Sequence, residues 1–281
     1  MGESALENRL PWVCPSCLDN GDSFRLTLNG SAATCERGHQ FDRAKQGYIN
    51  LHLPHKKRSK APGDDESMMS ARREFLAQGH YQCLMNALVS ALKDCTSQEN
   101  IKGLDIGCGE GSYIRYLSNH IINIDWLGID ISKPAIKKAA GANKQTFFAV
   151  ASGSGIPLPA GELDLALVVF APLDVTELQR VLKKGGVLVR VSPAKNHFIE
   201  LKRELYETVT LHEAPTTLSG FNVEQEISVC EILHLDNVSL QLLLAMTPLQ
   251  WRGDNDKKTL LKQVENFDIT CDFIIQVMRY E

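Results

Sequence analysis

The chain has 281 residues and a formal net charge of −4, with 43% hydrophobic and 23% charged residues, a composition that is ordinary for a globular protein. No apolar run is long enough to span a membrane, and the N-terminus, MGESALENRLP, lacks a basic segment followed by an apolar core. The eight cysteines do not indicate a disulfide scaffold in a chain of this length without a secretion signal. We therefore expect a cytoplasmic protein with one large domain and a smaller one.

Three cysteines gather with a histidine near the N-terminus. Cys14-Pro-Ser-Cys17 and Cys35-Glu-Arg-Gly-His39 form two short ligand pairs, and the residues between them suffice for a hairpin. Three thiolates and one imidazole complete a tetrahedral zinc site with no open position for water, which indicates a structural metal. Zinc would then supply folding energy that so short a segment lacks. The alternatives are a redox pair, which would need a βαβ context that is missing, or reduced cysteines without a special role.

A basic segment follows the predicted zinc site. Residues 1–60 contain nine Lys and Arg residues against six Asp and Glu residues, although the whole chain is acidic. The run His55-Lys-Lys-Arg-Ser-Lys60 is flanked by prolines and glycine, so it reads as an exposed linker. Lys56, Lys57 and Arg58 could neutralise RNA phosphates, although such a run is often only a solvated loop.

Two helices are expected after this linker. Asp64 or Asp65 would cap the first, which continues to about Gly79 with Met68, Met69, Phe75 and Leu76 on its apolar side. The second would run from about Tyr81 to Lys93, with leucines and alanines at helical spacing. We expect both helices to connect the zinc segment to the main fold.

The segment Ile101–Gly111, IKGLDIGCGEG, predicts a buried strand, a glycine turn and a helix beginning at Ser112. Such a turn directs backbone N–H groups at a carboxylate or phosphate. A second strand ends in Asp130, about 20 residues after the glycines, where an acid binds a ribose diol. An ordinary turn without a ligand and an NAD site are the alternatives. DIGCGEG with Asp130 resembles the first two motifs of class I S-adenosylmethionine-dependent methyltransferases, which implies a methionine moiety over Gly107–Gly111 and the ribose at Asp130.

Strands and helices alternate from Ile101 onward, which predicts a mostly parallel sheet covered on both faces. The residues near the carboxyl ends of its strands include Phe170-Ala171-Pro172, where methyltransferases that act on nucleobases often hold the target base; Phe170 is otherwise a buried aromatic. The last part of the chain predicts a closing antiparallel hairpin. Strands are expected at 101–106, 124–129, 145–150, 163–170 and 186–191, and helices at about 112–119, 133–140 and 175–183.

Over its whole length the chain resembles the zinc-containing guanine-N1 methyltransferases of 23S ribosomal RNA, the RlmA type, which includes macrolide-resistance relatives. The resemblance rests on the four zinc ligands, the run His39–Leu51, Pro62-Gly-Asp64, Met68-Met-Ser-Ala-Arg-Arg-Glu-Phe-Leu76, Gly79-His-Tyr81, Asp105–Gly111 and Ala171-Pro172. It implies an α/β class I methyltransferase, Rossmann-like with a seven-stranded sheet, preceded by a small zinc-binding domain. The expected divisions are 1–54 for zinc and RNA recognition, 55–98 for the linker and connecting helices, and 99–281 for the methyltransferase.

The resemblance also implies site residues and partners. The cofactor S-adenosylmethionine would contact Tyr81, Asp105, Gly107, Gly109, Glu110, Gly111, Asp130 and His197. The zinc domain and basic linker would grip a hairpin of 23S ribosomal RNA, while a lone histidine such as His197 is on general grounds more often a packed residue. A homodimer is a further expectation that no residue pattern supports. Leu173 and Asp174 depart from the small or polar residues usual after Ala171-Pro172.

The expected reaction transfers a methyl group to guanine N1, which carries a proton and must be unpaired and swung out. Asp174, Glu110 and His197 are geometrically possible proton acceptors, so no catalytic residue is assigned. Two other readings stay open: a methyltransferase of this fold that acts on another RNA, a small molecule or a protein, and a non-enzymatic RNA-binding factor with a degenerate cofactor pocket.

Overall fold

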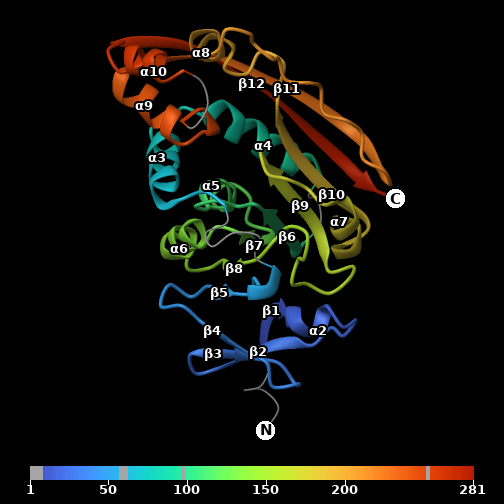
Figure 1. The fold of residues 1–281 in the computed structure, drawn as a ribbon. Helices are drawn as coiled ribbons and strands as arrows, with labels where there is room; N and C mark the ends of the chain where they lie inside the picture. Colours follow the sequence, from blue (N-terminus) through green and yellow to red (C-terminus); the bar gives the residue numbers. More distant parts are fainter. Residues whose placement is uncertain (1–8, 57–62, 96–98, 251–253) are drawn as a thin grey trace.

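The computed structural model describes residues 9–56, 63–95, 99–250 and 254–281. A small N-terminal module lies below a larger α/β domain in Figure 1, and the long C-terminal strands lie at the opposite side of the molecule. Lys57 and Arg58, two of the predicted RNA contacts, lie outside the described residues.

The N-terminal module is built on a four-stranded antiparallel sheet with its strands in chain order. Its hairpin of β2 and β3 confirms the hairpin predicted between the two ligand pairs. The elements are β1 (Arg9–Val13), α2 (Pro15–Leu18), β2 (Arg25–Asn29), β3 (Ala32–Thr34) and β4 (Gln40–Asp42).

The large sheet has the order β11-β12-β10-β9-β6-β7-β8-β5. Strands β6 to β10 are parallel to one another, and β12 is antiparallel to both β10 and β11, which confirms the predicted closing hairpin. The strands are β5 (Ile49–Asn50), β6 (Ile101–Ile106), β7 (Ile124–Asp130), β8 (Phe147–Val150), β9 (Leu163–Val169), β10 (Leu182–Pro193), β11 (Phe221–Asp236) and β12 (Asn266–Tyr280).

Within the described residues this sheet has eight strands, where the sequence predicted seven. The additional strand is β5, which pairs in parallel with β8 and comes from the segment predicted to belong to the zinc domain. Two residues are too few for a period-2 pattern, so this strand has no signal in the sequence. The predicted boundary at residue 54 remains a prediction.

Both helices predicted after the basic linker are present, at Glu66–Ala77 and Gln82–Cys95. Asp65 caps the first helix by accepting hydrogen bonds from the backbone N–H groups of Ser67 and Met68. The helices are α3 (Glu66–Ala77), α4 (Gln82–Cys95), α5 (Ser112–Ser118), α6 (Lys133–Ala142), α7 (Val175–Val181), α8 (Ile199–Leu205), α9 (Asn237–Ala245) and α10 (Asn255–Leu261), with short 3₁₀ turns at Pro54–Lys56 and Pro248–Gln250.

Alternate residues of the central strands face two apolar layers. Leu165 and Leu167 pack with α4 and α5, while Ala166 and Val168 pack with α7 and with the N-terminal module. This alternation follows from the period of two along a strand. Covering both faces explains why the central strands are almost continuously apolar.

The N-terminal module shares a core with the sheet. Trp12 and Leu26 belong to the same buried cluster as Leu104 of β6. Arg25 forms an ion pair with Glu162 at 2.8 Å, which joins β2 to the segment before β9. The two parts therefore pack as one body. Among the helices in the described ranges, none has the length and apolar character needed to cross a membrane.

Candidate functional site: a zinc centre and a glycine-loop cofactor site

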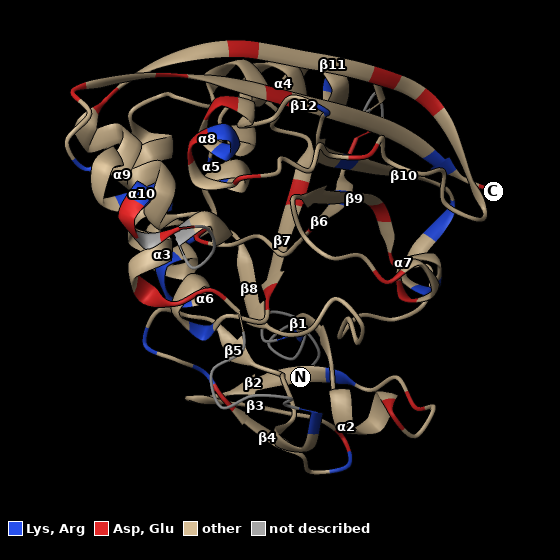
Figure 2. Cartoon of the chain, turned by 45° about the horizontal axis from the view of Figure 1, so that its top comes forward, with Lys and Arg blue, Asp and Glu red and all other residues tan. Residues whose placement is uncertain are grey.

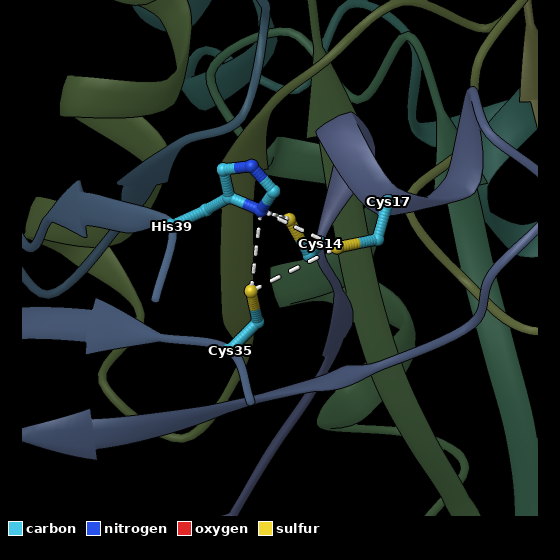
Figure 3. Close-up of side chains that lie close together, drawn as sticks. All are labelled: Cys14, Cys17, Cys35 and His39. Carbon is cyan, nitrogen blue, oxygen red and sulfur yellow. Dashed lines mark hydrogen bonds between the residues drawn. The ribbon is translucent and has the colours of Figure 1, made fainter. Parts of the chain in front are cut away.

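The four predicted metal ligands converge in the N-terminal module. Figure 3 shows the sulfur atoms of Cys14, Cys17 and Cys35 around the ring of His39. The Sγ atoms lie 3.3–3.5 Å from Nδ1 of His39, and those of Cys17 and Cys35 are 3.8 Å apart. All three cysteines are buried.

These distances fit zinc. A tetrahedral ion with ligands at about 2.3 Å for sulfur and 2.0 Å for nitrogen places two sulfurs about 3.8 Å apart and a sulfur about 3.5 Å from the nitrogen. The four donor atoms lie within 4.8 Å of one another, so one ion can contact all of them. Three thiolates and Nδ1 leave no position for substrate, so the centre is structural. It confirms the predicted ligands.

Local backbone structure presents the ligands. Cys14 precedes α2, whose single turn carries Cys17, and Leu18 donates its N–H to the Cys14 carbonyl at 3.0 Å. Cys35 and His39 flank a tight turn in which Gly38 has φ +82° and donates to the Cys35 carbonyl at 2.9 Å. A side chain is strained in that conformation, so the glycine permits the second ligand pair to close.

The glycine loop follows β6 as predicted. Gly107, Gly109 and Gly111 all have positive φ, and the last of them is the residue before α5. A Cβ atom added at Gly111 would lie 3.0 Å from the Cβ of Ala139, so the loop also packs closely on α6. The loop therefore brings bare backbone and a helix N-terminus to the carboxyl edge of the sheet.

Two acids flank this loop with different surroundings. Asp130 accepts hydrogen bonds from the N–H groups of Gly109 at 2.9 Å and Ser132 at 2.7 Å, so it links the two cofactor motifs. Asp105 is buried, and its Oδ2 has no hydrogen-bond partner in the described part of the chain. Burial and the neighbouring Asp130 charge raise the pKa of Asp105 well above its ordinary value.

The unpaired Oδ2 of Asp105 indicates which kind of ligand group this edge can accept. S-adenosylmethionine carries an ammonium and a sulfonium group, and a buried acid without a partner suits a cation. Glu110 is also buried; its Oε1 accepts from the N–H of Ser112 at 3.2 Å, and its Oε2 lies 3.9 Å from Arg115. The residues present at this edge thus fit the cofactor that the motifs imply.

His197 and Tyr81 join an aromatic cluster beside this edge. Phe273 of β12 lies between them, with its ring centroid 5.1 Å from Tyr81 and 4.8 Å from His197. Nδ1 of His197 accepts the N–H of Asp272 at 3.2 Å, so a neutral ring carries its proton on Nε2. Burial first, and then the charges of His212 and Lys202, lower the pKa of His197 to about 3.

Phe170 stands at the open side of this cluster. It directly follows β9, has φ +55° and is 43% exposed, and its ring centroid lies 6.2 Å from that of His197. An exposed aromatic ring in a strained backbone conformation at a strand end is typical of a ligand-binding position. The alternative prediction from the sequence, that Phe170 is a buried aromatic residue, is wrong.

Two residues beside the site were not predicted to belong to it. Arg72 of α3 reaches over the glycine loop: a Cβ atom added at Gly109 would lie 3.4 Å from its Nη1. Phe273 bridges Tyr81 and His197. The sequence predicted Arg72 only as part of a helix and Phe273 only as part of the closing hairpin, and the fold brings both to the site.

The remaining candidates have other partners. Asp174 accepts the N–H of Glu177 at 3.1 Å and so caps α7. Lys56 forms an ion pair with Asp19 of the zinc module and keeps 42% of its side chain exposed. Asp174 thus has a structural role, and Lys56 lies beside the zinc module as expected of a linker residue.

The strand order, the glycine loop after β6 and the acid at the end of β7 define a class I S-adenosylmethionine-dependent methyltransferase. Residues 104–190 match the family described as "Methyltransferase domain", and residues 12–60 match "RlmA, N-terminal". The YcgJ protein of Bacillus subtilis, a solved structure, has this fold with a TM-score of 0.50 and 14% identity over 72% of this chain and 99% of its own.

Full-length relatives define the family. The chain is 32% identical to "23S rRNA (guanine(748)-N(1))-methyltransferase" of Streptomyces fradiae, with 87% of each protein covered. It is 31% identical to "Putative 23S rRNA (guanine-N(1)-)-methyltransferase YxjB" of Bacillus subtilis, over 94% of this chain and 95% of that protein. The chain therefore belongs to the zinc-containing 23S rRNA (guanine-N1)-methyltransferase family. Its cofactors are S-adenosylmethionine and structural zinc, as the sequence resemblance implied.

Proposed function

We propose that this protein transfers the methyl group of S-adenosylmethionine to N1 of a guanine in a hairpin loop of 23S ribosomal RNA. The observation that carries the proposal is the core shared by the zinc module and the methyltransferase sheet, a buried cluster that contains both Trp12 and Leu104. A module joined rigidly to the sheet can hold a large substrate at a fixed position relative to the cofactor edge. The full-length relatives named for this reaction support the choice of substrate.

Phe170 is the platform that we assign to the target guanine. Guanine N1 lies on the pairing edge, so the base has to leave its stack before it can be methylated. A half-exposed aromatic ring offers a replacement stacking surface, worth about 1–3 kcal/mol per base. Phe273 lies behind Phe170 at a centroid distance of 5.6 Å and supports the ring from the buried side.

The bound cofactor supplies an electrophilic methyl group on its sulfonium. The chain then has to orient the guanine for in-line attack and exclude water. The buried Tyr81, His197 and Phe273 make an apolar wall suited to that task. Because Nδ1 of His197 is engaged by Asp272, this ring acts as a hydrogen-bond donor through Nε2 rather than as a base.

The N-terminal module is the side that we assign to RNA. Figure 2 shows Asp and Glu residues spaced along β11, at the margin opposite this module, where phosphates would be repelled. Arg43 and Lys45 of the module are exposed, and Lys56 is partly so. Lys57 and Arg58 stay predicted RNA contacts, and the hairpin, the homodimer and the cytoplasmic location stay predictions.

The test compares ribosomal RNA from cells that have and lack this protein. N1-methylguanosine blocks base pairing, so reverse transcription should stop at one position in a hairpin loop, and the stop should disappear on deletion. Nucleoside mass spectrometry of the excised fragment should identify N1-methylguanosine. Re-expression of the wild type should restore the stop, and Asp130→Ala, which removes the bridge between the two cofactor motifs, should not.

Two outcomes would contradict the proposal. An unchanged stop pattern on deletion would exclude a ribosomal guanine N1 as the target. A restored stop with Asp130→Ala would mean that the cofactor edge described above is not where the reaction takes place. Transfer of labelled methyl groups to protein or to small molecules would then be measured in extracts of the deletion strain.

A further inference from the structure

Arg72 of α3 lies beside the glycine loop. Its guanidinium is next to Gly109, since a methyl group at that glycine would lie 3.4 Å from Nη1. Burial raises the pKa of Asp130 on the other side of the loop, and the charge of Arg72 is one of the interactions that oppose this rise. The guanidinium thus faces both cofactor motifs from α3.

The surroundings of the loop are otherwise acidic. Asp105, Glu110 and Asp130 all lie on or beside it, and Arg115, which is also near, donates to Ser112 Oγ at 2.8 Å. The amino-acid part of S-adenosylmethionine carries a carboxylate as well as an ammonium. The acids suit the ammonium, but the carboxylate needs a cation in addition to the backbone N–H groups of the loop.

In the structure Arg72 is paired with a carboxylate of the protein itself. Its Nη2 lies 3.3 Å from Oδ2 of Asp64, and both side chains are about one third exposed. The position of Asp64 is fixed, because its carbonyl accepts from Ser132 Oγ at 2.6 Å and Asp65 caps α3. Asp64 thus presents a carboxylate to Arg72 at the edge of the cofactor site.

We propose that Arg72 binds the carboxylate of S-adenosylmethionine and that Asp64 is the competing carboxylate that it leaves when the cofactor binds. Guanidinium groups form paired hydrogen bonds with carboxylates, and exchanging one carboxylate for another keeps the arginine neutralised in both states. This inference rests on the cofactor and is independent of which base is methylated.

The experiment measures calorimetric affinities for two cofactor fragments. S-adenosylhomocysteine and 5′-methylthioadenosine share the adenosine and an uncharged sulfur, and only the first has the amino-acid group. Arg72→Gln should lower the affinity for S-adenosylhomocysteine about 10- to 100-fold, as expected for loss of a charge-assisted pair. The affinity for 5′-methylthioadenosine should change less than about threefold. Because removing a cation near the ammonium would strengthen binding, a loss of affinity reports on the carboxylate.

Asp64→Asn tests the exchange. Removing the competing charge should raise the affinity for S-adenosylhomocysteine about 2- to 10-fold and leave the affinity for 5′-methylthioadenosine unchanged. Arg73→Gln is the matched control, because Arg73 is the next residue on α3 and is exposed; it should alter neither affinity. Arg72→Lys replaces the glutamine variant if that variant does not fold. It should lower the affinity for S-adenosylhomocysteine selectively, because lysine cannot form the paired hydrogen bonds.

The outcomes are distinguishable. Equal weakening of both fragments by Arg72→Gln, or no weakening of either, would overturn the carboxylate contact. Weaker S-adenosylhomocysteine binding by Asp64→Asn would overturn the competition, since Asp64 would then be orienting Arg72. If the wild type bound neither fragment, the cofactor assignment itself would fail, which is a separate result.

Discussion

Gly107 faces Ala171 so closely that a Cβ atom on the glycine would lie 2.4 Å from the Cβ of Ala171. Gly107 directly follows β6, and Ala171 follows Phe170 after β9, so this contact joins the cofactor loop to the proposed platform for the target base. Gly107 also has φ +76°, a conformation that other residues adopt only with strain.

Gly107→Ala should therefore damage both loops. The clash and the strain together should lower the free energy of unfolding by about 1–3 kcal/mol and reduce cofactor affinity, as measured by thermal unfolding and calorimetry. Gly155→Ala is the control, because Gly155 has no atom within 4 Å of an added Cβ and no positive φ. Equal stability and affinity for the two variants would show that the loops have room to separate.

Removing a zinc ligand should disrupt more than the N-terminal module. Cys17→Ser should abolish stoichiometric zinc and, because Trp12 and Leu26 pack on the sheet, also lower the melting temperature of the whole protein. Cys230→Ser, at an exposed position, should retain zinc and stability. Zinc content by atomic emission and hydrogen exchange of residues 9–42 are the measurements. Full zinc occupancy in Cys17→Ser would exclude this centre.

The elements that were predicted correctly have a local pattern within their own residues. Ile101–Ile106 was predicted with the observed bounds because a short, mainly aliphatic segment is followed by the first glycine of the loop. Asp65 was one of two predicted caps, and its carboxylate accepts the hydrogen bonds that define a cap. The zinc ligands were identified because two short ligand pairs leave few other interpretations.

The relationships that were missed connect distant parts of the chain. Strand β5 exists because Ile49 and Asn50 meet the edge of β8, about a hundred residues later in the sequence. Arg72 belongs to the site because α3 packs over a loop that follows it by more than 30 residues. Propensity and spacing act locally, so neither kind of contact has a sequence signal.

Glu162 should make the contact between the N-terminal module and the methyltransferase domain sensitive to acid. Burial acts to raise its pKa, but hydrogen bonds from Lys102 and Arg25 outweigh burial, so the pKa is lowered. A lowered folded-state pKa stabilises the protein above the unfolded value, about 4.3, and this stability is lost as the pH falls through the folded value. Glu162→Gln should cost about 1–3 kcal/mol at pH 7.

The comparison of Glu162→Gln with the wild type should be made by denaturant unfolding from pH 7 down to pH 3. The difference between the two proteins should begin to shrink as the pH falls below the unfolded-state value, about 4.3, and should continue to shrink through the lower folded-state value. Zinc content is measured at each pH, and only pH values at which both proteins retain zinc are compared, because loss of the zinc module would also remove Arg25 from Glu162. Glu204→Gln, at an exposed position, should match the wild type throughout. A difference that stays constant with pH would mean that charge on Glu162 contributes nothing.

Phe170→Ala should separate RNA recognition from cofactor binding. Loss of the stacking surface should lower kcat/KM for an RNA hairpin by about 10- to 100-fold, in line with about 1–3 kcal/mol per stacked base. Affinity for S-adenosylhomocysteine should stay within about twofold. Phe170→Tyr should keep most of the activity, because its ring still stacks.

Phe147→Ala supplies the matched control for Phe170→Ala. Phe147 is 44% exposed and Phe170 is 43% exposed, so both substitutions remove an equally accessible ring. Phe147 lies at the beginning of β8, whereas the proposed site lies at the carboxyl ends of the parallel strands. Its removal should leave kcat/KM unchanged. An equal loss with both variants would point to a general effect of exposed aromatic rings on RNA binding, and the stacking role of Phe170 would be rejected.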